Sequence, residues 1–122
     1  MGVDVTDGSF LMENNNLLLI ADFSRYPSGR DSNDSTYNGE DYRKNILLPK
    51  IETAIEQGHV LTVSLRGVMS FGSSFLEEAF GGLVRKEGLS KADILSHLEI
   101  DPGKPNFGRY KHAILKYIKD AP

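Results

Sequence analysis

Hydrophobic residues in this chain follow two patterns that alternate along it. Leu17–Phe23 is a continuous apolar run with the length of a buried strand. His59–Leu65 is a second hydrophobic run, rich in β-branched residues, and His97–Ile100 is a shorter third one. Continuous apolar runs are typical of strands that are covered on both faces, as in parallel sheets. The sequence therefore predicts strands at these three positions.

Between and after these runs, hydrophobic residues recur at helical spacing. Asn38 is a capping residue followed by carboxylates, and Gly58 provides a helix end, so a helix is expected between them. Pro49 lies inside this helix and is expected to kink or break it, because proline removes one backbone hydrogen bond. The predicted helical ranges are about 39–57, 73–86 and 106–119, with a short helical turn at 90–96 capped by Ser90.

The alternation of strands and helices predicts a single α/β domain over residues 1–122, with a mixed, largely parallel sheet packed with helices. Val3–Met12 alternates weakly around an Asp-Gly turn signal, which predicts a short hairpin or an edge strand. Ser24–Asn38 is rich in Ser, Asn, Pro and Gly and is longer than most connections. This loop is therefore expected to be functional or mobile.

Composition restricts the classes of function. The 122 residues carry a formal net charge of −3, which argues against a general nucleic-acid binder. There is no cysteine, so a disulfide, a thiol nucleophile and a cysteine zinc site are excluded, and the three histidines share no metal-ligand spacing. The acidic N-terminus has no signal-peptide pattern, and no run approaches the ~18 apolar residues of a membrane span. We expect a cytoplasmic protein without a metal or cofactor.

The turn that contains Ser73 and Ser74, after the second predicted strand, carries the candidate chemistry, and we call it the serine turn. Ser73 and Ser74 stand at the start of the second predicted helix, where free N–H groups and the positive end of the helix dipole favour an oxyanion or a phosphate. Ser74 and Glu77 have the spacing of a capping box, so Ser74 is interpreted as a structural N-cap. Ser73 is not needed for the cap, so its hydroxyl is the better candidate for modification or ligand contact. The alternative is a turn serine without a role.

The helix after this turn has a predicted outer face. At about 100° per residue, Glu78 and Gly82 lie opposite the apolar stripe. Two adjacent glycines, Gly81 and Gly82, are unfavourable inside a helix, which indicates close packing against a neighbouring element or a partner protein, or an early helix end. Phe71 and Phe75 flank the serines, and at least one is expected to be an exposed interface anchor. The predicted partner surface consists of Phe71, Gly72, Ser73, Phe75, Glu78 and Gly82.

The segment LTVSLRGVMSFGSSFLEEAFGGLVR, residues 61–85, resembles the signature of the STAS-like domain family of unknown function. RYPSGR and YNGEDYRKNILLPKIETA, upstream of it, are similar to the same family's Gly-Arg loop and following helix. That family is related to the STAS domains of anti-sigma factor antagonists and sulfate transporters, so the resemblance implies a STAS-like α/β fold.

The same resemblance implies a role for the serine turn. In anti-sigma factor antagonists, a serine in an Asp-Ser-Ser-Gly loop at this strand-to-helix junction is phosphorylated by a partner kinase of the histidine-kinase ATPase type, which releases the partner. Ser73 matches the modified serine and Ser74 the one after it. Gly72 stands in place of the aspartate and Phe75 in place of the glycine.

Three hypotheses for function follow. The first is a regulatory module that binds a partner protein, such as an ATPase or kinase, through the Ser73-Ser74 loop and the following helix, with serine phosphorylation as a candidate switch. The alternative is a small-ligand, nucleotide or phosphate binder that combines this helix N-terminus with the loop arginines Arg25 and Arg30. A serine hydrolase is the least favoured, because no histidine base can be assigned to Ser73, so the protein is expected not to be an enzyme.

The terminal helix is a separate feature of the sequence. It is basic in an otherwise acidic protein, and its surface either meets an acidic partner or is an ordinary solvated face. The residues concerned are Arg109, Lys111, His112, Lys116 and Lys119.

Overall fold

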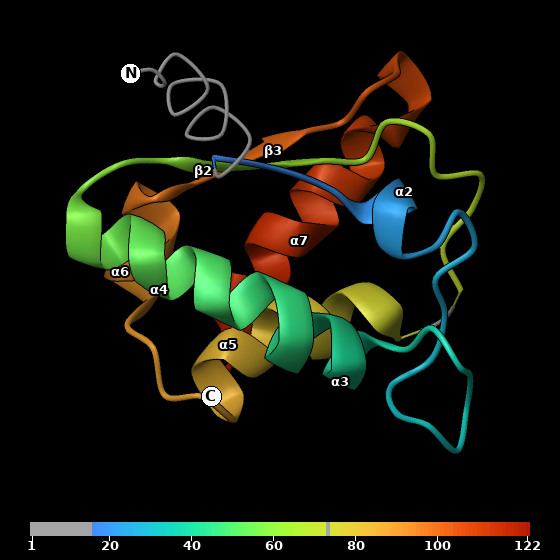
Figure 1. Ribbon diagram of the computed structural model, residues 1–122, viewed down its shortest axis with the longest axis horizontal. Coiled ribbons are helices and arrows are strands. Elements are labelled where there is room, and N and C mark those ends of the chain that lie inside the picture. Colours follow the sequence, from blue (N-terminus) through green and yellow to red (C-terminus); the bar gives the residue numbers. More distant parts are fainter. Residues whose placement is uncertain (1–15, 73) are drawn as a thin grey trace, which may run out of the picture.

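The computed structural model describes residues 16–72 and 74–122, which form a small parallel sheet with helices packed against it (Figure 1). The strands are β1 (Leu17–Leu19), β2 (Leu61–Ser64) and β3 (Leu98–Asp101), all parallel and in the order β1-β2-β3. The expected α/β fold with a largely parallel sheet is confirmed. Val3–Met12, where a hairpin or an edge strand was expected, lies outside the described residues.

The first long helix has the predicted bounds and contains a π-helical turn. It consists of α3 (Gly39–Tyr42), the π turn η1 (Arg43–Leu47) and α4 (Leu48–Gln57). The Asn38 side chain caps it by accepting a hydrogen bond from the Asp41 N–H at 2.9 Å, and Gly58 ends it with a φ of 73°. Pro49 does not break the helix, and the expected irregularity takes the form of the π turn just before the proline.

The second helix starts at Phe75, two residues later than predicted, and also contains a π turn. After Phe75 and Leu76 it consists of the π turn η2 (Glu77–Gly81) and α5 (Gly82–Arg85). Helix α6 (Lys91–Ser96) has the predicted Ser90 cap, whose hydroxyl accepts the Asp93 N–H at 3.2 Å. The terminal helix comprises the 3-10 turn η3 (Pro105–Phe107) and α7 (Gly108–Asp120).

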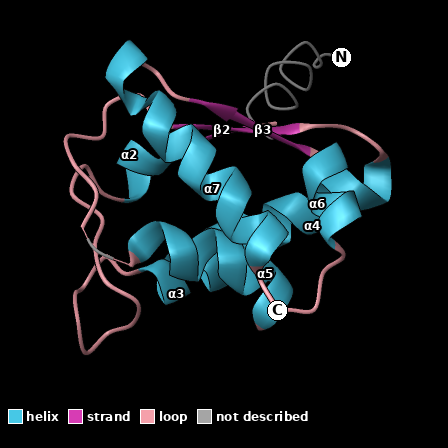
Figure 2. Ribbon diagram, turned by 180° about the vertical axis from the view of Figure 1, so that it is seen from behind, coloured by secondary structure: helices cyan, strands magenta, loops and turns pink. Residues whose placement is uncertain are grey.

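The long helices all lie on one side of the sheet. Right-handed crossovers that run in one direction, as the order β1-β2-β3 requires, put their helices on the same face. Figures 1 and 2 show α4, α5 and α7 on this side. The register aligns Leu18, Val63 and Ile100, and the last two are buried core residues. The carboxyl ends of the strands thus share one edge, from which the loops to the helices depart.

Only the first half of the run Leu17–Phe23 is a strand, so that prediction is partly wrong. Ile20–Phe23 forms the short helix α2, closed by a hydrogen bond from the Ser24 N–H to the Ile20 carbonyl oxygen at 3.0 Å. Ile20 is fully buried, and the ring of Phe23 packs against that of Tyr42. The run is apolar because a buried helical turn follows the strand, and a short apolar run cannot distinguish this case from a longer strand.

Candidate functional site

The loop after α2 and the loop after β2 run side by side beyond the carboxyl edge of the sheet. The loop after β2 leads to the serine turn. The Met69 N–H bonds to the Arg25 carbonyl oxygen and the Gly72 N–H to the Pro27 carbonyl oxygen, each at 2.8 Å. A Cβ atom at Gly72 would lie 2.1 Å from Cβ of Ser28. Position 72 therefore has no room for a side chain while the loops are paired in this way.

Ser74 does not cap the helix as the capping-box spacing predicts. Its φ is 71°, in the left-handed region, whereas a capping residue has an extended backbone. A capping box would direct the Glu77 carboxylate back to the serine, but that carboxylate pairs with Arg30 and Arg85 instead. The N-cap interpretation is therefore wrong, and Ser74 holds an unfavourable backbone conformation at the helix start. Ser73 lies outside the described residues.

The helix face that was predicted to meet a partner is buried. Phe75 is fully buried, Glu78 is 3% exposed, and Gly82 is buried as well. The π turn η2 adds a residue to one turn, which shifts positions relative to a regular helical wheel. The first long helix also crosses this face closely, since a Cβ atom at Gly39 would lie 2.7 Å from the Phe75 carbonyl oxygen. The predicted partner surface is therefore wrong at Phe75, Glu78 and Gly82.

A buried ion pair joins the two π turns. The Arg43 side chain is fully buried, and its Nη1 lies 2.7 Å from Oε2 of Glu78 and 2.6 Å from the Glu78 carbonyl oxygen. Its Nε lies 2.9 Å from Oε2 of Glu87, and its Nη2 has no hydrogen-bond partner among the described residues. The guanidinium packs directly on Gly82. Of the explanations for the two glycines, close packing of a neighbouring element is confirmed at Gly82.

Further cations surround this pair. Arg30, from the loop between α2 and α3, pairs with Glu77 and Glu78, and Arg85 pairs with the same two carboxylates. Lys86 lies 3.1 Å from Oε2 of Glu78. The Arg30 contacts fasten the loop to the start of the second helix, so they help to fix the surroundings of the serine turn.

The charges of this network keep both carboxylates ionised. Burial alone raises the pKa of Glu78, but the hydrogen bonds and charges of Arg43 and Lys86 outweigh burial and lower that pKa to about 2. Burial likewise raises the pKa of Glu77, and hydrogen bonds from Arg30 and Arg85 outweigh it, so this pKa is also below its ordinary value. Near neutral pH neither group carries a proton to donate, which fits a structural role.

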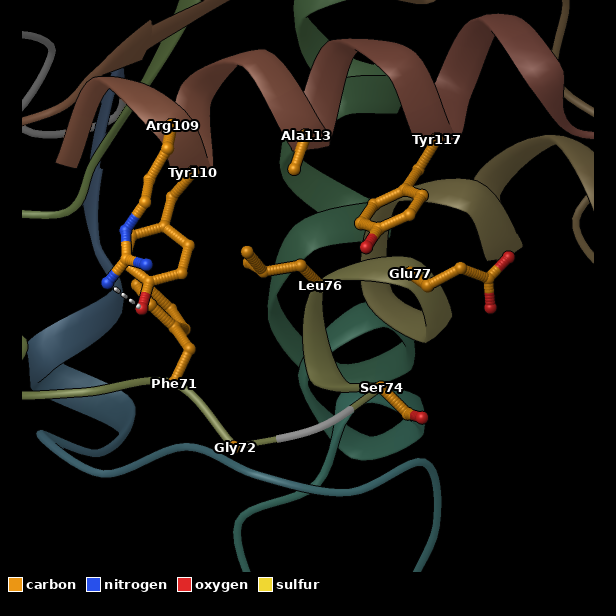
Figure 3. Close-up of a pocket in the computed structure, with 9 residues that line it drawn as sticks. All are labelled: Phe71, Gly72, Ser74, Leu76, Glu77, Arg109, Tyr110, Ala113 and Tyr117. Carbon is orange, nitrogen blue, oxygen red and sulfur yellow. Dashed lines mark hydrogen bonds between the residues drawn. The ribbon is translucent and has the colours of Figure 1, made fainter.

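A cleft of about 380 Å³ lies between the serine turn and α7 (Figure 3). Phe71 and Leu76 line it on the side of the turn, and Tyr110, Ala113 and Tyr117 line it from α7. Figure 3 shows both tyrosine side chains reaching down from α7 towards the turn. The rest of the lining comes from Gly72, Ser74, Glu77 and Arg109. Phe71, Gly72 and Ser74 are thus the predicted site residues that meet at an accessible hollow.

Ser74 also borders a second cleft, of about 370 Å³, on the side of the loop between α2 and α3. Its lining consists of Ser28, Gly29, Arg30, Asp34 and Ser74. The structure thus brings together Arg30 and Ser74, two residues of the predicted ligand site. Arg25 does not line this cleft, because its Nε donates a hydrogen bond to the Gly67 carbonyl oxygen at 3.0 Å.

Sequence reasoning missed three residues of this region. The helical spacing of Tyr110 and Tyr117 favours the core, whereas both are half-buried and line the first cleft. The available signal was the phenol group, because tyrosine often places its polar end at a surface or an interface. Arg43 was missed as well, because its local sequence does not distinguish it from an exposed helix arginine.

Within residues 16–72 and 74–122, no group of three or more His, Asp or Glu side chains could hold a metal ion. None of His59, His97 and His112 lines either cleft. No described helix is long and apolar enough to cross a bilayer.

A small parallel α/β domain with its candidate site at a strand-to-helix junction is the arrangement expected of a STAS-like domain. The family model of the STAS-like domain of unknown function (DUF4325) matches residues 39–101, just over half of the chain, so the chain belongs to this family. The match includes both π turns, the buried ion pair and the serine turn, whereas Arg30 and α7 lie outside it. No curated protein and no solved structure matches the chain.

Proposed function

We propose that this STAS-like domain is a regulatory module that binds a partner protein at the first cleft, between the serine turn and α7. The observation that carries the proposal is the cleft itself, which presents Phe71, Tyr110 and Tyr117 around a volume of about 380 Å³. Aromatic side chains that combine apolar surface with a polar end are frequent anchors of protein interfaces. In this proposal the serine turn still takes part in partner binding, as expected from the sequence. The buried helix face with Phe75, Glu78 and Gly82 does not.

The resemblance to anti-sigma factor antagonists suggests a histidine-kinase-type ATPase as the partner and serine phosphorylation as the switch. Ser74 borders the cleft, so a phosphate on it would place negative charge at the interface. Ser73 is the residue that matches the modified serine. Phosphopeptide mapping of the protein isolated from its own cell, compared with Ser73→Ala and Ser74→Ala variants, tests the switch. An unmodified turn under all growth conditions would contradict it.

We also propose that the domain acts by binding and not by catalysis. The absence of a histidine from the lining of both clefts supports this, because a serine nucleophile needs a base. The firmly ionised state of Glu77 and Glu78 supports it too, since neither can serve as a general acid near neutral pH. The proposal would be overturned if the wild-type protein hydrolysed model esters and the Ser73→Ala or Ser74→Ala variant did not.

The binding proposal is tested by affinity capture from cell extract with the full chain as bait. Ala113→Arg places a bulky side chain in the middle of the cleft, and we expect it to abolish capture of the partner. His112→Arg is the matched control, because this exposed neighbour on α7 does not line the cleft. Equal capture by both variants, with native circular dichroism spectra, would place the interface elsewhere.

A second function, binding of a phosphate-bearing small ligand, is favoured by one observation. Arg30 and Ser74 line the same cleft, as the ligand hypothesis requires. Against this, Arg30 is already paired with Glu77 and Glu78, and the Asp34 carboxylate borders the same space. Thermal shifts with inorganic phosphate and with nucleotides test it. Stabilisation that is lost in Arg30→Gln would favour this function over partner binding.

A further inference from the structure

Basic side chains gather next to the first cleft, at the carboxyl edge of the sheet. They come from three loops and one helix: Arg25 follows α2, Arg66 follows β2, Lys104 follows β3, and Arg109 lies in the first turn of α7. We call these four residues the basic rim. In a parallel sheet the carboxyl ends of the strands share one edge, so loops after different strands bring their side chains together there.

Several contacts join the loops that carry the basic rim. Arg25 bonds to the Gly67 carbonyl oxygen in the loop after β2, and a Cβ atom at Gly103 would lie 2.8 Å from Cα of Arg66. The loops that carry Arg25, Arg66 and Lys104 therefore touch one another.

Aromatic rings connect these loops to α7. Nζ of Lys104 lies 4.2 Å from the ring centre of Phe107, which packs on Tyr110. The Arg109 guanidinium lies 4.7 Å from the Tyr110 ring centre, and that ring packs on Phe71 at 4.8 Å. Figure 3 shows Arg109, Tyr110 and Phe71 together at one end of the cleft.

Within residues 16–72 and 74–122, the basic rim has little compensating negative charge. Among the described residues, no acidic side chain forms an ion pair with Arg25, Lys104 or Arg109, and Arg66 lies 3.8 Å from Asp101. Two lysines elsewhere on α7 have acidic partners, in the pairs Lys111–Glu99 and Lys116–Asp120. The chain as a whole carries a net charge of −3, so the rim is a local positive surface on an acidic protein.

We infer that the first cleft and the basic rim together bind an acidic segment of the partner protein, with an apolar side chain in the cleft and carboxylates on the rim. This inference rests on the proposed function and specifies the chemistry of the partner. Arginine forks match carboxylates in geometry and charge, and Phe71, Tyr110 and Tyr117 suit an apolar anchor. A nucleic acid is disfavoured, because the net negative charge of the chain opposes a polyphosphate.

The experiment is a selection from a random-peptide library displayed on phage, with the full chain as bait. We expect the enriched peptides to combine an aromatic or aliphatic residue with several Asp or Glu residues. The best peptide is then labelled, and its affinity is measured by fluorescence anisotropy. Arg109→Glu should weaken binding roughly tenfold or more, because it reverses a charge at the cleft. Lys119→Glu, the same charge change at the far end of α7, should change affinity little.

Other results would overturn the inference. They include enriched peptides that are basic or show no charge bias, a selection without enrichment, and equal losses in Arg109→Glu and Lys119→Glu. Tighter binding of an oligothymidine than of the selected peptide would show a nucleic-acid surface instead. The proposed function is judged separately by capture of the cellular partner. If Ala113→Arg abolishes that capture while Arg109→Glu does not, partner binding stands and the acidic-segment inference falls.

Discussion

The guanidinium of Arg43 fills the place that a side chain at Gly82 would occupy, since a Cβ atom there would lie 2.3 Å from Nη1 of Arg43. This close approach allows the buried arginine to reach both the carboxylate and the carbonyl oxygen of Glu78. A buried charge separated from its partners is costly, so stability requires the Arg43 guanidinium to stay close to the backbone at Gly82. Glycine at position 82 is therefore explained by a contact within the fold.

Gly82→Ala should destabilise the protein although alanine is the better helix former. The methyl group would displace the Arg43 guanidinium, and we expect a loss of about 3 kcal/mol in the free energy of unfolding, which exceeds the ~1 kcal/mol gained in helix propensity. Gly108→Ala is the control, because a Cβ atom there would meet nothing within 4 Å beyond its chain neighbours and its own helix backbone. It should be neutral or stabilising. Denaturant unfolding checks both, and a Gly82→Ala variant as stable as wild type would contradict the packing argument.

Removal of the buried arginine should cost more than removal of its neighbour. Arg43→Met leaves Glu78 buried without its main partner, and we expect a loss of roughly 3–5 kcal/mol. Lys44→Met is the matched control, since Lys44 is exposed and its ion pair with Glu40 lies at the surface, where such pairs contribute about 0–1 kcal/mol. Urea midpoints measure both. Similar losses in the two variants would mean that the buried network contributes little.

The ion network also predicts how stability depends on pH. The pKa of Glu78 is about 2 in the folded protein and has an ordinary value of 4.5, so the unfolded chain binds a proton first as pH falls. The contribution of Glu78, on the order of 3 kcal/mol, should be complete above the unfolded pKa and should be lost as pH falls towards the folded value. Unfolding free energies measured at decreasing pH test this. Carboxyl NMR titration provides the control, and a Glu78 pKa near its ordinary value would refute the assignment.

Local sequence patterns were sufficient for the elements whose causes are local. The caps at Asn38 and Ser90 were predicted, because each depends on a hydrogen bond within a few residues. The parallel sheet was predicted from the alternation of apolar runs and amphipathic stretches. The α2 turn at Ile20–Phe23 was not, because burial makes strand and helix residues equally apolar over so short a run.

The candidate site depended on contacts that no local pattern records. Arg43 and Glu78 are 35 residues apart in sequence, and neither shows locally that it is buried. A helical wheel places Glu78 on the outside because it assumes a regular helix, and the π turn Glu77–Gly81 violates that assumption. The serine turn itself was located correctly at a strand-to-helix junction, but the α7 wall of its cleft required the tertiary structure.

Ser74 should respond to substitution according to its left-handed backbone. Glycine adopts a φ of 71° without steric cost, so Ser74→Gly should raise the unfolding free energy by roughly 0.5 kcal/mol after its greater flexibility in the unfolded chain is counted. Ser74→Ala keeps the same steric cost and should change stability little. Thermal and denaturant unfolding measure both variants. A loss of about 1 kcal/mol in Ser74→Ala would show that the hydroxyl caps the helix after all.

Gly72→Asp tests why this turn lacks the aspartate of the antagonist pattern. A Cβ atom at position 72 would lie 2.1 Å from Cβ of Ser28 and 3.0 Å from its Cα. We therefore expect the variant to lose roughly 1–3 kcal/mol and to separate the paired loops. Separation should appear as faster hydrogen exchange of the Met69 N–H, which bonds to the Arg25 carbonyl oxygen.

A double-mutant cycle with Ser28→Gly shows whether the clash is the cause. Ser28→Gly removes the Cβ at 2.1 Å and the Oγ at 3.3 Å and leaves the Cα at 3.0 Å. The cost of Gly72→Asp should therefore shrink, but not vanish, in the Ser28→Gly background, because residues in contact are not additive. If the cost is the same in both backgrounds, the loops do not exclude an aspartate. The glycine at position 72, in place of the aspartate of the antagonist pattern, would then have a chemical and not a steric reason. That result would count against the phosphorylation switch.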